Sequence, residues 1–440
     1  MAVTVKASMA VVSGVVLVAA CGAAGNTARA RTAGAAGARG SDCLTRTAPA
    51  CYTPWVFRIA YGIQPLLDRG IDGRGVTVVQ PEEAETRPGP SPSVTNIRQD
   101  LADFDRRFGL PPARIQVITT LAGPSASPWL ATREEVEDTE LEHAVAPDAT
   151  ICELLVNPAD VRTPARIAAT FATYVRIAAR HGQVISQTSV GQRISTGEDS
   201  FTSAEVATIN SALEYAAARH VTVVAGSGDQ GAIGNGPRRA LVSGKRTPVR
   251  QVILPASDPL VLAAGGSSLT ANPVTGGYIS ETAFNQGGGS VFASGGGFSH
   301  LFARPAYQDG VPGIGAMRGV PDVAADASPD TGMALAISAP DGSYVLVPAR
   351  GTSASAPTWA GLIALADQQA GHPLGFVNPA IYRIARGPLY HKAFHDITTG
   401  NNTVIVNGVT ITGYQARPGW DPVTGWGTPD AQVLIRLLAR

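Results

Sequence analysis

The chain has 440 residues, enough for two or three domains of ordinary size or for one large α/β domain. Its 34 basic residues balance 34 acidic ones, and only 15% of the residues are charged, so the composition offers no basic surface of the kind that binds nucleic acid. Hydrophobic residues make up 44% of the chain, which excludes an intrinsically disordered protein.

The amino-terminal segment has the pattern of an export signal. Residues 9–20 form an apolar run behind Lys6 that is too short to span a bilayer. We therefore predict a signal peptide over residues 1–20 and an extracellular or cell-surface protein. The run ends in Val-Ala-Ala before Cys21, like a bacterial lipobox, which would attach the chain to a membrane through a lipid on Cys21. Cleavage at an ordinary small-residue site near Ala30 is the alternative.

The next segment, residues 21–51, is rich in Ala and Gly and shows no periodicity, so we interpret it as a tether. Outside the cytoplasm, Cys43 and Cys51 would most simply form a local disulfide. Cys152 lies in an apolar run and is expected to be a buried hydrophobic residue. Residues 52–440 are expected to form one compact domain.

Short apolar runs alternate with helical patterns along the rest of the chain. Strands are expected at 75–79, 114–119, 149–156, 183–186, 221–225 and 260–264, and helices at 94–108, 133–145, 163–181, 203–220 and 354–370. Short, non-alternating strands separated by helices indicate an α/β fold with a mostly parallel sheet that is covered on both faces.

A glycine pattern at residues 226–231 spells G-x-G-x-x-G after a predicted strand. A dinucleotide site would also need a helix that opens at Gly231 and an acidic residue about 20 positions further on. The segment that follows is a loop, and no acidic residue occurs between Asp229 and Asp258. We therefore reject a dinucleotide site here.

A candidate nucleophile stands at the start of the last predicted helix, in the sequence GTSASAP at 351–357. Ser353 could be a helix N-cap, but its small neighbours leave the hydroxyl accessible, and the motif resembles the nucleophile motif of subtilisin-like peptidases. The histidine motif of subtilisins is absent. Only His143 lies inside a predicted helix, and we favour a packed histidine there.

The densest acidic cluster lies at residues 133–142, where six of ten side chains are carboxylates. Such a cluster is often a solvated helix face. Glu134 and Asp138 are four positions apart and share a helix face, as do Asp138 and Glu142. The spacing alone does not choose between these pairs.

With these motifs the chain resembles the sedolisin, or serine-carboxyl, peptidase family, which includes the kumamolisins. The resemblance runs from YTP at 52–54 and AYGI at 60–63 through PAS at 255–257, GGGFS at 295–299 and VPDV at 320–323 to GTSAS at 351–355. It implies a subtilisin-like three-layer sandwich and places the two acids of the family's acidic helix on Glu134 and Asp138. Glu137 stands where the family usually has Leu, and the strand end after Ser186 lacks the family's usual Trp.

The resemblance also implies a mechanism at acidic pH. Ser353 would be the nucleophile, Glu134 its general base and Asp138 the residue that orients Glu134 and shares its charge. The family's oxyanion aspartate matches Asp229 in SGDQG at 227–231. A carboxyl kept protonated there could donate a hydrogen bond to the oxyanion, together with the backbone N–H of Ser353.

A calcium site is implied near the carboxyl terminus. The matching residues would supply carboxylates from Asp396 and Asp421 and backbone carbonyls from Ile397, Arg417 and Gly419, the oxygen ligands that calcium prefers. Arg417 falls where many family members have Gly. We expect one structural calcium ion.

Two alternatives to an acid-acting peptidase stay open. The long prodomain of the family is not found between the predicted signal and residue 52, so a non-catalytic surface binding protein on the same fold is one alternative. A neutral-pH Ser-His hydrolase that uses His143 is the other. We expect a monomer that acts on peptides or proteins, with no nucleic-acid partner and membrane contact only through a lipid at Cys21.

Overall fold

A computed structural model describes residues 51–85, 94–188, 196–234, 239–242, 245–288, 290–338 and 343–440. The predicted signal peptide, the lipobox at Cys21 and the tether up to residue 50 lie outside the described residues, as does Cys43 of the predicted disulfide. These expectations and the domain boundaries therefore stay predictions. Within the described ranges, no helix has the length and apolar character that crossing a bilayer requires.

The centre of the fold is an eight-stranded sheet with the order β13-β12-β8-β6-β1-β5-β3, in which β16 also pairs with β12. All of its pairs are parallel except that of β12 with β13. The strands are β1 (Thr77–Glu83), β3 (Arg114–Leu121), β5 (Thr150–Val156), β6 (Val184–Gln187), β8 (Thr222–Gly226), β12 (Val261–Ala271), β13 (Tyr278–Ala283) and β16 (Val323–Asp326).

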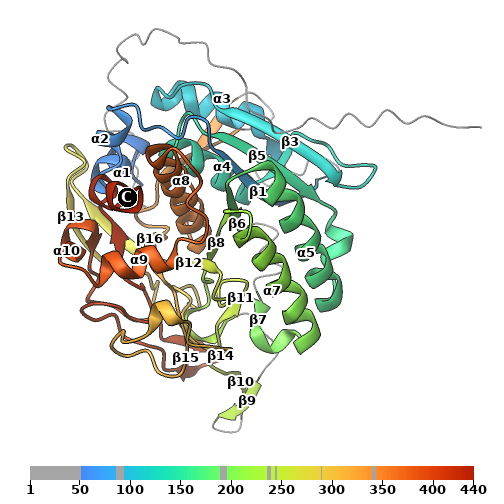
Figure 1. The fold of residues 1–440 in the computed structure, drawn as a ribbon, viewed down its shortest axis with the longest axis vertical. Coiled ribbons are helices and arrows are strands. Elements are labelled where there is room, and N and C mark those ends of the chain that lie inside the picture. Colours follow the sequence, from blue (N-terminus) through green and yellow to red (C-terminus); the bar gives the residue numbers. More distant parts are fainter. Residues whose placement is uncertain are drawn as a thin grey trace, which may run out of the picture.

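Helices cover both faces of this sheet (Figure 1). Successive residues of β1 show why, because Val78 belongs to one hydrophobic cluster and Val79 to another on the opposite face. The cluster around Val79 includes residues of α5 (Pro164–His181) and α7 (Ser203–Ala217). The cluster around Val78 includes residues of α1 (Pro54–Ala60), α3 (Ile97–Phe108), α4 (Arg133–Val145), α8 (Thr352–Ala370), α9 (Asn378–Ala385) and α11 (Ala431–Leu438). The predicted α/β class with a mostly parallel sheet is confirmed.

Two helices that position the site pack directly against each other. Helix α4 starts with a capping box, in which Thr132 accepts from the N–H of Glu135 and the Glu135 side chain accepts from the N–H of Thr132. Helix α8 crosses it at Gly361, where a Cβ atom would lie 2.8 Å from the Cβ of Val145. The absence of a side chain at residue 361 therefore sets how closely the two helices approach.

The remaining elements are short and frame the sheet. The helix predicted at 94–108 was wrong at its start, because residues 94–96 form β2 (Val94–Asn96), which pairs with β4 (Leu130–Thr132), and the helix begins only at Ile97.

Short two-stranded sheets, not predicted from the sequence, include β14 (Gly297–Ala303) with β15 (Met317–Val320), β17 (Ala334–Ser338) with β18 (Tyr344–Pro348), and β20 (Val404–Val406) with β21 (Val409–Ile411). Others are β7 (Thr196–Gly197) with β11 (Ile253–Leu254), β9 (Arg239–Val242) with β10 (Lys245–Pro248), and β19 (Phe394–His395) with β22 (Thr428–Pro429). Helices α2 (Gln64–Leu67) and α10 (Tyr390–Ala393) are single turns.

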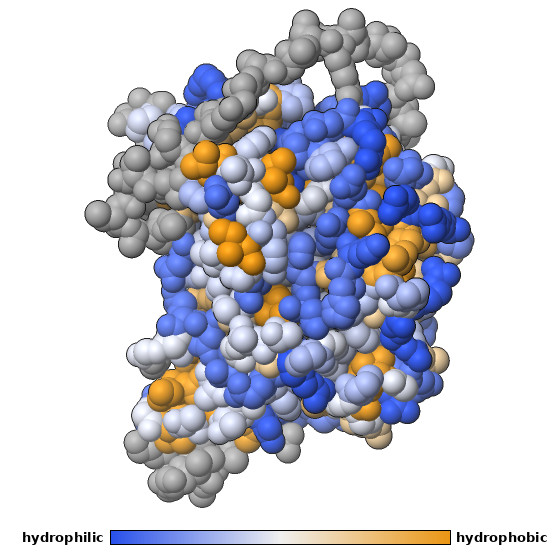
Figure 2. Space-filling model, turned by 90° about the vertical axis from the view of Figure 1, so that its left-hand side faces the viewer, coloured by the Kyte–Doolittle hydropathy of each residue, from blue (hydrophilic) through white to orange (hydrophobic). Residues whose placement is uncertain are grey.

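The surface in Figure 2 carries hydrophobic side chains in small separate groups between hydrophilic ones. Large hydrophobic side chains that are exposed are few among the described residues: Val274, Ile279, Val291, Leu301, Val345 and Ile405. Most buried hydrophobic side chains of the described residues therefore belong to the two clusters that flank the sheet.

Candidate active site

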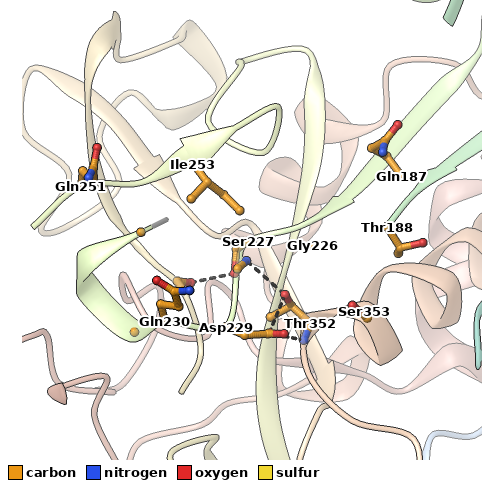
Figure 3. A pocket seen from close by; sticks show the side chains of 14 residues that line it. Gln187, Thr188, Gly226, Ser227, Asp229, Gln230, Gln251, Ile253, Thr352 and Ser353 are labelled. Atoms are coloured by element: carbon orange, nitrogen blue, oxygen red, sulfur yellow. Dashed lines mark hydrogen bonds between the residues drawn. The ribbon is translucent and has the colours of Figure 1, made fainter. Parts of the chain in front are cut away.

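A pocket of about 250 Å³ opens at the carboxyl ends of β6 and β8. Strand β1 pairs with β5 on one side and with β6 on the other, so the order of the strands along the chain changes direction beside β1. Open α/β sheets bind their ligands at the carboxyl ends of the strands near such a switch point. The side chains that line the pocket include Gln187, Thr188, Ser227, Asp229, Gln230, Gln251, Ile253, Thr352 and Ser353 (Figure 3). The predicted residues Ser353 and Asp229 thus face the same cavity.

Ser353 lies in the first turn of α8 and is partly exposed to the pocket. It is not the helix cap, because Gly351 holds the N-cap position and no side chain makes a capping bond within that turn. The second serine of the motif, Ser355, is fully buried and does not line the pocket. The alternative that Ser353 is merely an N-cap is therefore wrong.

Asp229 follows β8 and meets the start of α8. Its Oδ1 accepts hydrogen bonds from the Thr352 N–H at 2.6 Å and from the Thr352 hydroxyl at 3.0 Å. Burial raises the pKa of Asp229, and the bonds from Thr352 offset part of that rise. Gly351, with φ of 77°, has to be a glycine because a Cβ there would lie 2.5 Å from Asp229 Oδ2.

The two acids of α4 lie behind the pocket rather than in its wall. Thr188, which lines the pocket, donates a hydrogen bond to Oδ2 of the buried Asp138. Burial raises the pKa of Asp138 well above its ordinary value, and the neighbouring Glu134 carboxylate raises it further. Glu134 is partly buried in the first turn of α4. The structure connects Asp138 to the pocket through Thr188, and the catalytic roles of Glu134 and Asp138 stay predictions.

Helix α4 is also tied to the segment that precedes Ser353. Glu137, the departure from the family pattern, is buried and accepts a 2.6 Å hydrogen bond from the N–H of Arg350. Arg133 donates to the carbonyl of Pro348 at 2.9 Å. Burial raises the pKa of Glu137 well above its ordinary value, as does the charge of Glu134. Glu137 therefore holds the loop before Ser353 in place instead of adding an exposed charge.

His143 does not line the pocket. Its ring is fully buried, and Nε2 lies 2.8 Å from Asp105 Oδ1 and 2.9 Å from the carbonyl oxygen of Pro111. None of the described residues that line the pocket is a histidine. A hydrolase that uses His143 as the base for Ser353 has no support in this geometry.

The candidate calcium ligands lie on two neighbouring loops. Asp396 accepts from the N–H of Gly419 with both carboxylate oxygens at 3.1 Å, and Asp421 accepts from the N–H of Arg417 at 3.3 Å. Burial raises the pKa of Asp421 to about 7. The described residues contain no group of three or more His, Cys, Asp or Glu side chains that could hold a metal. An ion here would depend on two carboxylates completed by backbone carbonyls, a set made only of oxygen atoms.

Several pocket residues were not singled out from the sequence. Gln187 is the last residue of β6, Thr188 follows it, and Thr352 lies within the GTSASAP motif. Ligand sites of parallel sheets lie at the carboxyl ends of strands, so this general rule could have identified Gln187 and Thr188. Gln251 lies in a loop 101 positions before Thr352, and only the folded chain brings it to the same pocket as Ser353 and Asp229. No local pattern marks it.

The chain is similar to several known peptidases, although no protein-family profile matches it. It is 34% identical to kumamolisin of Bacillus sp. (strain MN-32) over 403 residues, which are 89% of this chain and 64% of that protein. It is also 34% identical to human tripeptidyl-peptidase 1 over 267 residues, 55% of this chain and 41% of that one. The chain thus spans less than two thirds of these curated relatives.

A solved structure of Pseudomonas sedolisin, a serine-carboxyl proteinase complexed with two molecules of pseudo-iodotyrostatin, superposes with a TM-score of 0.69 at 25% identity. The match covers 88% of this chain and 97% of that one. Sequence and structure therefore point to the same group of proteins.

Proposed function

Because the chain belongs to the sedolisin family on the subtilisin-like fold, we propose that it is a serine-carboxyl peptidase that hydrolyses peptide bonds at acidic pH. The observation that carries the proposal is the shared pocket of Ser353 and Asp229, with Asp138 joined to the same pocket through Thr188. Its substrates are peptides or proteins, and we place its action outside the cytoplasm.

In the proposed reaction, Ser353 Oγ attacks the carbonyl carbon of the peptide bond while its proton passes to Glu134. Glu134 then gives this proton to the leaving amine, and a water molecule repeats the sequence to release the acyl group. Asp138 orients Glu134. Because the pKa of Asp138 is raised by burial and by the charge of Glu134, it can hold a proton while Glu134 is ionised.

Asp229 is proposed to stabilise the oxyanion as a neutral acid. Its Oδ1 is occupied by the two donors of Thr352, which leaves Oδ2 to carry the proton. The O–H then donates to the oxyanion together with the N–H of Ser353. Burial favours this neutral form because it raises the pKa of Asp229. An ionised carboxylate would repel the oxyanion, so the mechanism requires acid.

The test is peptide hydrolysis from pH 3 to pH 8 by the full chain, with Ser353→Ala and His143→Ala as comparison variants. We expect the rate to rise below about pH 5, to vanish in Ser353→Ala and to persist in His143→Ala. A rate that rises through about pH 6.5 and depends on His143 would contradict the carboxylate mechanism. A folded protein without Ser353-dependent cleavage at any pH would instead be a binding protein.

We also propose that the carboxylates of Asp396 and Asp421, with the carbonyls of Ile397, Arg417 and Gly419, hold one calcium ion. When bound, the ion would neutralise the two carboxylates and fix the loops that carry them. The support is the convergence of both carboxylates on the 417–421 loop and the burial of Asp421. No step of the proposed reaction passes through the ion.

A further inference from the structure

The pocket wall contains a buried carboxamide for which the proposed mechanism has no use. Gln251 lines the pocket and is only 4% exposed, yet neither its Oε1 nor its Nε2 has a hydrogen-bond partner in the part of the chain that the structure describes. In Figure 3 it lies across the pocket from Ser353. A buried polar group without a partner is costly, so such a group in a pocket wall calls for a ligand that pairs with it.

Two glycines pack closely against Gln251. A Cβ at Gly197 would overlap the Gln251 carboxamide, and one at Gly234 would lie 2.9 Å from its backbone carbonyl oxygen and 3.0 Å from its Cγ. The N–H of Gln251 donates to the carbonyl of Ala232 at 3.0 Å. The carboxamide is therefore confined by Gly197 and its stem by Gly234, which lowers the cost of ordering the side chain when a ligand binds.

A second carboxamide lines the pocket at the opposite end from Gln251 (Figure 3). Gln187 is 2% exposed, and its Oε1 accepts a hydrogen bond from the hydroxyl of Tyr174, which fixes the orientation of the carboxamide. Its Nε2 has no partner among the described residues. Asp229 is the one ionisable residue among the described lining residues. Apart from Asp229, the pocket is therefore a neutral, hydrogen-bonding cavity.

We propose that Gln251 selects substrates in which the side chain that enters its end of the pocket terminates in a carboxamide or a protonated carboxyl group. This inference rests on the proposed function and names its substrate class. A substrate carboxamide offers an acceptor to Nε2 and a donor to Oε1 of Gln251, and a protonated carboxyl offers the same combination at acidic pH. An aliphatic side chain would leave the Gln251 carboxamide unpaired. At about 250 Å³ the cavity suits one side chain rather than a larger ligand.

The experiment is cleavage of a peptide library at pH 4 by the full chain, with mass-spectrometric mapping of the residues that flank each cut bond. We expect Gln, Asn, Glu and Asp to be enriched at one flanking position. In Gln251→Met, which keeps the side-chain length but removes both polar atoms, the enrichment at that position should fall about tenfold, with other positions unchanged. The same substitution at exposed Gln432 of α11 is the matched control and should change nothing.

Equal use of Leu or Met and Gln at every flanking position in the wild type would overturn the proposal, as would an unchanged preference in a folded Gln251→Met. If the wild type cleaves nothing, the proposed function fails, and this inference is then decided by binding. In that case fluorescence polarisation with Ser353→Ala compares two labelled Gly-rich peptides that differ in one central residue, Gln or norleucine. Tighter binding of the Gln peptide than of the norleucine peptide, lost when Gln251→Met is added to Ser353→Ala, supports the site. Equal binding of the two peptides to Ser353→Ala overturns it.

Discussion

Asp229 accepts both hydrogen bonds from Thr352 through one oxygen, so an amide can take its place without breaking them. In Asp229→Asn the amide oxygen would accept from Thr352 and the NH₂ group would donate to the oxyanion. Since an amide does not titrate, we expect activity at pH 4 within about tenfold of wild type and an upper pH limit that moves to higher pH.

Asp229→Ala removes the proposed oxyanion donor altogether. We expect its kcat to fall by about 10²–10³ at pH 4, the cost of losing one oxyanion donor. The pH dependence of kcat for the two variants separates the effects. The direction follows from the raised pKa of Asp229, because the neutral donor is present below that pKa and is lost as pH rises through it. An upper limit that is unchanged in Asp229→Asn would assign it to another carboxyl group.

Among elements, the contact of α4 with α8 determines where the acids stand relative to Ser353. In Gly361→Ala the new Cβ would meet Val145 at 2.8 Å, so the helices must separate. We expect a loss of about 1–3 kcal/mol in the free energy of unfolding, measured with urea at pH 4, and a lower kcat. Gly315→Ala, where a Cβ meets nothing within 4 Å, is the matched control and should leave kcat and stability unchanged.

If the two loops hold calcium as proposed, thermal stability should depend on the ion. Chelation should lower the thermal unfolding midpoint of the wild type, because the carboxylates of Asp396 and Asp421 would then lie at the 417–421 loop without a cation. Asp396→Asn should unfold at the lower temperature already and should no longer respond to the chelator. A wild-type midpoint that is indifferent to chelator and to added calcium would exclude a structural ion at this place.

Element types were predictable where the pattern is local. The bounds predicted for α4 agree with the structure, and the predicted strands at 114–119 and 149–156 match β3 and β5 within two residues. The start of α3 was missed because pairing of β2 with β4, a tertiary contact, overrides the helical pattern of residues 94–96. The short strand pairs of the glycine-rich half also depend on distant partners.

The candidate site was predictable only in part, for the same reason. Ser353 and Asp229 were found through motifs, and the structure brings both to one pocket. The bond from Thr188 to Asp138 joins residues 50 positions apart, so no motif contains it. Gln251 was missed because its environment, two glycines from other segments, exists only in the fold.

For the whole molecule, buried carboxyl groups make stability depend on pH. Burial raises the pKa of Glu142 and of Glu153 from about 4.5 to about 8. Between these values the folded protein binds more protons than the unfolded chain, so their contribution is complete below about pH 4.5 and falls as pH rises toward 8. We expect the thermal midpoint to be highest in acid and to decline across this range.

Replacing these two groups with amides tests the assignment. In the double variant Glu142→Gln, Glu153→Gln, the decline of the thermal midpoint between pH 4.5 and pH 8 should be shallower than in the wild type. Glu214→Gln, on the exposed face of α7, should leave the slope as it is. A wild-type midpoint that rises toward neutral pH would contradict a stabilising contribution of these two groups in acid.

The hydrogen bond from Arg350 to Glu137 joins residues 213 positions apart, and that from Thr352 to Asp229 spans 123. Contacts between such distant parts of a chain form late in folding, because most of the intervening segments must first be gathered. During synthesis and folding, Ser353, Asp229 and the acidic residues of α4 are therefore still apart. The chain gains the proposed ability to cut peptide bonds only when it has itself become compact, and its own unfolded segments are spared until then.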